Sequence, residues 1–169
     1  NLLTRDSEIL RKITDQDGDG IYDSSVVFAD GFNRAGSGIA AGVLADSDQV
    51  YFASIPELWR FETTSPEATE PASRNILSEG YGVHIGVTGH DLHGLTWGPD
   101  GRLYYSVGDR GFSVRTQEGN WLDFPDTGGV LRCEPDGANL EVFAYGMRNP
   151  QELAFDAFGN LFTGDNDTN

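Results

Sequence analysis

The sequence has few of the residue types that would cross-link the chain, carry it through a membrane or attract it to nucleic acid. Its single cysteine, Cys133, excludes an internal disulfide, and no run of 18 or more apolar residues could cross a membrane as a helix. Only 11 Lys and Arg residues stand against 27 Asp and Glu, which gives a net charge of -16 at pH 7. This charge argues against nucleic acid and against an anionic membrane surface as partners, so we expect neither contact.

Glycine and aromatic residues are abundant instead, with 22 Gly, 10 Phe, 6 Tyr and 3 Trp among 169 residues. With one Met and no long runs of strong helix formers, this composition is typical of β-strands joined by tight turns. The length fits one ordinary domain. Because the chain starts at Asn1 without a methionine, we expect it to be cut from a longer protein, and the lack of a signal peptide excludes no location.

Turn residues between apolar segments predict four antiparallel hairpins. The best-defined turn is Gly98-Pro99-Asp100-Gly101, where proline presets φ and the Asp-Gly pair tolerates positive φ. The hairpins are expected over 38–53, 95–107, 129–144 and 151–163, with turns near Asp46, Pro99, Pro135 and Phe158. Further strands are expected over 25–32 and 58–61, an exposed polar loop over 63–73, irregular structure over 112–127, and either a strand or a short helix within 1–14.

A repeat defines the fold class. Residues 94–105 align without gaps on residues 152–163, an offset of 58 residues, and 38–53 is a looser copy. Four-stranded units that recur every 40–50 residues or so indicate a β-propeller, although unrelated hairpins in a β-sandwich are the alternative. We therefore predict an all-β chain that is a partial β-propeller. It would supply about three blades of a six-bladed ring, with 1–169 as a fragment of one propeller domain that exposes apolar edges.

All three histidines, His84, His90 and His93, lie within ten positions just before the Pro99 hairpin. An unperturbed imidazole titrates near neutral pH, so it is the usual general base of enzymes. Histidines in such a cluster are also often loop residues with satisfied hydrogen bonds. The spacing alone leaves both interpretations open.

An acidic loop lies near the start of the chain. Asp15, Asp17, Asp19 and Asp23 occupy the first, third, fifth and ninth positions of a calcium-binding loop, and a glycine provides its sharp bend. The twelfth position, which calls for a bidentate glutamate, is Val26. A truncated calcium loop and a plain acidic turn both remain open.

Three longer segments carry a family resemblance: HGLTWGPDGRLYYSVGD, GGVLRCEPDG and GMRNPQELAFDAFGNLF. Together they resemble the glucose/sorbosone dehydrogenase family, the six-bladed propellers that include the soluble quinoprotein glucose dehydrogenases. Nearly the whole chain resembles more closely the predicted membrane-bound dehydrogenases of planctomycetes and their relatives. The GPDG turn alone is common in unrelated propellers, whereas a histidine eight residues before it with a downstream RNPQ is more specific.

The resemblance implies a dehydrogenase that oxidises a sugar or alcohol hydroxyl with pyrroloquinoline quinone (PQQ) as hydride acceptor. His90, eight residues before Gly98, matches the family's catalytic base. The family's preceding Asp is Gly89 here, and Asp91 follows instead, so the partner that orients the imidazole is open and His93 is the alternative base.

The resemblance also implies a calcium ion, a cytochrome as a possible electron acceptor, and a periplasmic or extracellular location at the cell envelope. The 58-residue offset places Arg148 at the repeat position of His90, so we expect both at the same end of neighbouring blades. A calcium-binding propeller without activity, serving as a carbohydrate- or protein-binding module, is the alternative function. The implied quinone-binding residues are Arg148, Asn149 and Gln151, and the implied calcium-binding residues are Gly164, Asp165 and Asp167.

The same residues have simpler interpretations. Arg148 could form a salt bridge between blades, and Asp165 could belong to an ordinary acidic turn. Asp109 and Arg110, which end a predicted strand, are expected to form a solvated turn.

Overall fold

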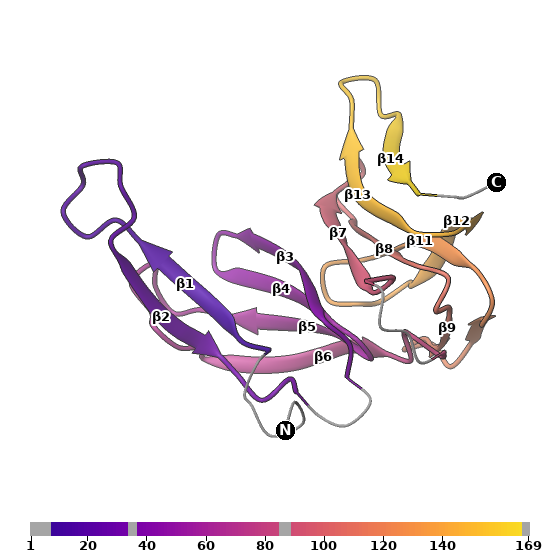
Figure 1. The fold of residues 1–169 in the computed structure, drawn as a ribbon, viewed down its shortest axis with the longest axis horizontal. Helices are drawn as coiled ribbons and strands as arrows, with labels where there is room; N and C mark the ends of the chain where they lie inside the picture. Colours follow the sequence, from indigo (N-terminus) through magenta and orange to yellow (C-terminus); the bar gives the residue numbers. More distant parts are fainter. Residues whose placement is uncertain (1–7, 34–36, 85–88, 167–169) are drawn as a thin grey trace.

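The computed structural model describes residues 8–33, 37–84 and 89–166. Within these residues the chain forms fourteen β-strands and no helix, which confirms the prediction of an all-β protein (Figure 1). The described residues accordingly contain no helix long and apolar enough to cross a membrane.

The N-terminal hairpin is formed by two antiparallel strands that the acidic loop connects. The sequence of residues 1–14 is compatible with a strand or a short helix, and the structure has a strand over Leu10–Thr14. Buried Phe28 and Phe32 pack beneath it with Phe52 and Phe61 of the following sheet, which attaches the hairpin to the rest of the molecule. The two strands are β1 (Leu10–Thr14) and β2 (Ser24–Ala29).

The first four-stranded sheet has its strands in sequence order, β3-β4-β5-β6, all antiparallel. The hairpin expected near Asp46 is confirmed as β3–β4. The two central strands contribute fully buried side chains such as Tyr51, Leu58 and Phe61. The strands are β3 (Ala40–Asp46), β4 (Gln49–Ser54), β5 (Glu57–Glu62) and β6 (Ser73–Glu79), and residues 63–72 connect the last two.

The second four-stranded sheet has the order β12-β11-β8-β7. The hairpins expected near Pro99 and Pro135 are both confirmed. The strands are β7 (Leu92–Trp97), β8 (Leu103–Val107), β11 (Gly128–Cys133) and β12 (Glu141–Met147). β7 begins three residues earlier than expected, so His93 lies within a strand and not in the loop before it.

The expectation of irregular structure over 112–127 is wrong. This segment contains the hairpin of β9 (Phe112–Arg115) and β10 (Trp121–Phe124), which is inserted between the middle strands of the second sheet. Each strand has only four residues. So short an alternation of apolar and polar side chains is hard to distinguish from a loop in sequence.

The chain ends in a two-stranded hairpin around Phe158, as expected, formed by β13 (Pro150–Phe155) and β14 (Leu161–Asp165). The first strands of three successive sheets lie together, because β7 packs against β3 on one side and β13 on the other (Figure 1). Glycines permit this approach: a Cβ on Gly42 would collide with Leu95, and a Cβ on Gly94 would lie 2.5 Å from the Gln151 carbonyl oxygen.

One core joins the two large sheets. Tyr51 and Leu58 of the first sheet and Leu92, Leu103 and Tyr105 of the second are fully buried in a single cluster. Burying a side chain of this size stabilises the fold by roughly 1.5–3 kcal/mol. These contacts fix the position of the second sheet relative to the first. The two ends of the second sheet are therefore fixed as well.

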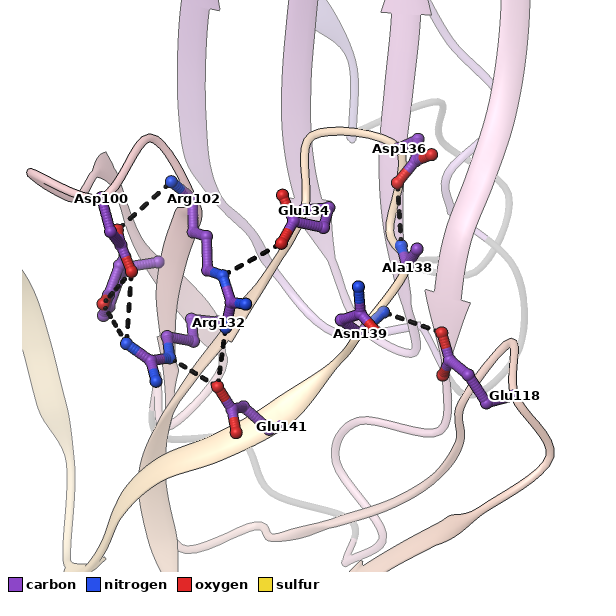
Figure 2. A network of polar contacts seen from close by, with 10 residues as sticks. Asp100, Arg102, Glu118, Arg132, Glu134, Asp136, Ala138, Asn139 and Glu141 are labelled. Carbon is purple, nitrogen blue, oxygen red and sulfur yellow. Dashed lines mark hydrogen bonds and ion pairs between the residues drawn. The ribbon is translucent and has the colours of Figure 1, made fainter.

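At the Pro99 end of the second sheet, charged side chains form an exposed network (Figure 2). The Arg102 Nε lies 3.0 Å from the Glu134 Oε1, and its Nη1 lies 2.8 Å from the Glu141 Oε1. The Arg132 Nε lies 2.7 Å from the same Glu141 oxygen, and its Nη1 lies 3.2 Å from the Asp100 Oδ2. The network thus links β8, β11 and β12 around their turns.

Candidate active site

The opposite end of the second sheet brings together a histidine and a carboxylate. His90 lies just before β7 and Asp109 just after β8, so the antiparallel pairing of these strands places them side by side. The His90 Nδ1 is 2.5 Å from the Asp109 Oδ1. Because an ionised carboxylate can only accept, Nδ1 carries the proton in this contact, and in the neutral imidazole Nε2 then presents a lone pair. His90 is 7% exposed, and its Nε2 makes no hydrogen bond within the described part of the chain.

Asp109 and Arg110 form a turn, as expected, and Asp109 is partly exposed, but the expectation that this turn is solvated is wrong for Arg110. Arg110 is buried and forms an ion pair with Asp91, which is 2% exposed. The Arg110 Nε also donates to the His84 carbonyl, 2.9 Å away. Asp91, the carboxylate that follows His90 in sequence, thus faces Arg110, and the group that orients His90 is Asp109.

His93 has both ring nitrogens engaged. Its Nδ1 lies 2.7 Å from the Gln151 carbonyl oxygen and 3.1 Å from the Ser106 Oγ, and its Nε2 lies 3.3 Å from the Asn149 side-chain amide. The carbonyl oxygen is an acceptor, so Nδ1 is protonated here too. Through the Nδ1–H bond to Gln151, His93 joins β7 to the start of β13 whether or not Nε2 is protonated, while Nε2 donates to the Asn149 Oδ1 only in the doubly protonated ring. Its geometry is that of a structural histidine, which leaves His90 as the histidine with a free nitrogen.

The Arg148–Asn149 segment is fixed by Asp165. The two oxygens of this carboxylate accept the Arg148 N–H at 3.1 Å and the Asn149 N–H at 2.7 Å. The Arg148 carbonyl in turn accepts the Asp109 N–H at 2.7 Å. His90 and Arg148 are therefore brought to the same end of neighbouring sheets, with Asp109 between them. The Arg148 guanidinium, which is half-buried, donates to the carbonyl oxygen and Oδ1 of Asn166, at 2.9 and 3.0 Å.

His90 and Asn149 approach each other over Gly108, which sequence reasoning missed. A Cβ on Gly108 would lie 2.6 Å from the His90 Cβ and 2.9 Å from the Asn149 Oδ1, so only glycine fits between them. Asn149 is 1% exposed, and its Nδ2 has no hydrogen-bond partner within the described residues. A buried amide without a partner is unfavourable, so this nitrogen is a candidate donor to a bound group.

The remaining residues implied by the resemblance lie at the edge of this cluster. Gln151 contributes its main-chain carbonyl to His93, while its side chain is exposed. Gly164 is exposed in β14 next to Asp165. Asp167 lies outside the described residues.

The acidic loop lies at the tip of the β1–β2 hairpin, on the far side of the molecule from β7 and β13 (Figure 1). Carboxylate oxygens of Asp15, Asp17 and Asp19 lie within 4.8 Å of one another. Asp15 accepts the N–H groups of Gly20 and Gly18, both at 2.8 Å, and the Gly20 N–H above all lowers its pKa. The fourth carboxylate, Asp23, accepts the Gln16 N–H at 3.0 Å. The loop is thus preformed, with three carboxylates converging.

Comparison with known proteins identifies the family of the chain but not its function. No curated protein and no solved structure matches the chain. The model of one protein family matches residues 4–169, nearly the whole length. The chain belongs to this family, which is described as a domain of unknown function, DUF7133.

Proposed function

We propose that this chain carries the general base of a β-propeller dehydrogenase that oxidises a sugar or alcohol hydroxyl. The observation that carries the proposal is the His90–Asp109 pair, with Nδ1 held by the carboxylate and Nε2 unengaged. The resemblance to the glucose/sorbosone dehydrogenases supports it independently, because His90 is the residue that matches that family's base.

A partial propeller is the finer fold that we propose. Two four-stranded antiparallel sheets follow each other along the chain, and a third begins with β13 and β14. Their first strands, β3, β7 and β13, pack side by side. This is the arrangement in which propeller blades surround a central axis. In this arrangement the His90 end of β7 and the Arg148 end of β13 would face the same rim.

The proposed oxidation removes two hydrogens from an alcohol, one from the O–H bond as a proton and one from the adjacent C–H bond as a hydride, and each goes to its own acceptor. His90 Nε2 takes the hydroxyl proton, and the hydride on the same carbon passes to the oxidant, leaving a carbonyl. Asp109 fixes the Nδ1–H tautomer and stabilises the imidazolium that forms. Asp109 does not need to accept the proton itself.

PQQ fits the donors that lie beside His90. When bound, it would supply the hydride acceptor, and its oxygen atoms require hydrogen-bond donors. The unpartnered Asn149 Nδ2 is such a donor, and the neighbouring Arg148 guanidinium would be a second one if it left Asn166. A cytochrome acceptor and a periplasmic or extracellular location belong to the proposal through the resemblance alone.

Calcium fits the two predicted loops unequally. Asp165 belongs to no group of three converging acidic side chains among the described residues, so it is a weaker candidate ligand than its sequence suggests. The Asp15 loop offers three converging carboxylates, although these also accept backbone N–H groups. This cluster favours the second candidate function, a calcium-binding propeller without activity that binds a carbohydrate or protein.

The proposal is tested on the full-length protein with PQQ and calcium chloride, using dye reduction by aldoses and polyols as the assay. His90→Gln should lower turnover by about 10²–10⁴-fold, as expected for loss of a general base. It should leave quinone binding, read from absorbance, nearly unchanged. Arg148→Ala should weaken quinone binding as well.

His84 offers a matched control, because it also pairs with an aspartate, Asp126, at 2.9 Å, but on the surface. His84→Gln should retain full turnover. The proposal is wrong if the protein binds no quinone, or if His84→Gln loses as much activity as His90→Gln. Calcium binding without any quinone binding would favour the second candidate.

A further inference from the structure

A groove of about 680 Å³ lies between the first sheet and the β9–β10 hairpin. It is separate from the His90 cluster, with which it shares no residue. This volume is within the range of ligand-binding pockets. The groove is lined by Pro56, Glu79, Gly80, Ser113, Arg115, Thr116, Gln117, Gly119 and Trp121.

The floor of the groove is held by main-chain hydrogen bonds. The Pro56 carbonyl accepts the Gly80 N–H at 2.9 Å, and the Gly80 carbonyl accepts the Ser113 N–H at 2.9 Å. Any Cβ on Gly80 would collide with the Ser113 carbonyl, so glycine is required for this approach. The groove is therefore a preformed feature of the fold.

The β9–β10 hairpin has one apolar and one polar face, and Trp121 is on the polar one. The inward residues Phe112, Val114, Leu122 and Phe124 pack into the core. Trp121 pairs across the hairpin with Arg115 and is 65% exposed. No other aromatic ring or cation contacts its indole in the part of the chain that the structure describes.

Two charged side chains that line the same groove are also unengaged. Within the described residues neither Glu79 nor Arg115 forms a hydrogen bond or an ion pair through its side chain. By contrast, Arg102, Arg110 and Arg132 each form an ion pair. The groove thus combines an uncovered flat ring with one strong acceptor and one strong donor.

We propose that this groove binds a neutral saccharide chain, with one sugar ring stacked on Trp121. A sugar ring has an apolar C–H face that fits an aromatic face, and its rim of hydroxyls fits a carboxylate and a guanidinium. The charges of Glu79 and Arg115 cancel, and a net charge of -16 disfavours acidic polysaccharides. A protein partner would need a well-packed apolar centre, whereas this open groove presents one exposed ring and two charged side chains.

The test is binding of cellohexaose, xylohexaose, mannohexaose and laminarihexaose to the full-length protein without added quinone. Tryptophan fluorescence and calorimetry are the readouts. At least one oligosaccharide should bind, and Trp121→Ala should weaken that binding by about tenfold or more, because a stacking interaction is lost. Trp121→Tyr should restore most of it. Leaving quinone out separates this result from the proposed oxidation chemistry.

Phe158→Ala is the matched control, since Phe158 is another exposed aromatic side chain, 90% exposed, at the β13–β14 turn. It should bind like the wild type, and circular dichroism should show that Trp121→Ala is folded. The proposal is overturned if none of the four oligosaccharides binds at millimolar concentration, or if folded Trp121→Ala binds unchanged. It is also overturned if sedimentation shows that Trp121→Ala abolishes self-association while saccharide binding is absent, because the face would then be a protein interface.

Discussion

The two ends of the second sheet use the same kinds of charged groups in opposite ways. At the Pro99 end, Arg102 and Arg132 are about one-quarter exposed and share acidic partners in an open network (Figure 2). At the other end, Arg110 and Asp91 are buried as a pair, and His90 contacts Asp109 beside them. What distinguishes the Arg110–Asp91 pair is access to water, since its side chains are 8% and 2% exposed, whereas the Asp109 side chain is partly open to solvent.

Water decides what each pair contributes. Exposed ion pairs typically contribute about 0–1 kcal/mol, because solvent screens them and the side chains must be ordered. Within a protein interior a charge that loses its partner is strongly destabilising. The exposed end is therefore expected to tolerate substitution, whereas the buried end holds its groups in one arrangement. A general base needs this second kind of environment.

The largest effect is expected from breaking the buried pair. Asp91→Ala should lower the free energy of unfolding by about 3–5 kcal/mol, because Arg110 is left buried without a counter-charge. Urea denaturation measures this. The double variant Asp91→Leu with Arg110→Met should recover much of the loss. A loss below about 1 kcal/mol in Asp91→Ala would show that both ends are equally solvated.

Cys133 shows that a side chain at the exposed end of the sheet can still be buried. It lies at the end of β11, near the charged network, yet it is buried. Burial raises the pKa of its thiol to about 12, and the nearby carboxylates of Asp136 and Glu134 act in the same direction. The folded protein should thus resist thiol reagents at pH 8 and react after denaturation. The stabilising contribution of the raised pKa should be present below about pH 8.5 and be lost as pH rises toward 12. Fast labelling of native protein would contradict this.

A small effect is expected at the exposed end. Glu141 pairs with both arginines, yet Glu141→Gln should reduce the free energy of unfolding by only about 0.2–1 kcal/mol. The difference should shrink further in high salt. Thermal unfolding at two salt concentrations measures both. A salt-independent loss of several kcal/mol would mean that the network is shielded from solvent.

The smallest effect is expected from the acidic loop. Calcium should bind there with a dissociation constant near or above about 10⁻⁴–10⁻³ M, because Val26 replaces the bidentate glutamate. Since its hydrogen bonds lower the pKa of Asp15, the stability that they give should be present above about pH 4 and be lost at lower pH. Calorimetry showing submicromolar binding that Asp17→Ala removes would show that the loop is a complete site.

The sequence predicts the strands better than the contacts between strand ends. Four hairpins follow from their turn residues, and the 58-residue repeat places Arg148 and His90 at equivalent ends. The β9–β10 hairpin is missed because its strands are too short for a clear alternation. Asp109 and Gly108 are missed for another reason. Their role depends on which residues the β7–β8 pairing brings beside His90, and no local pattern contains that information.

The choice between the two histidines shows the same limit. In sequence His90 and His93 lie eight and five residues before Gly98, and Asp91 is the nearest carboxylate to both. In the structure a strand begins between the two histidines, so His93 is held by Ser106 and Asn149 while His90 remains outside it. The start of β7 had to be known within three residues to tell them apart.

The most direct test of the account is the tautomer of His90, which long-range ¹H–¹⁵N NMR of the protein reports near neutral pH. We predict that neutral His90 carries its proton on Nδ1, and that Asp109→Ala shifts it toward the common Nε2–H form while His93 is unaffected. A His90 that is already Nε2–H in the wild type, or one that Asp109→Ala leaves unchanged, would contradict the claim that Asp109 holds this imidazole as a base.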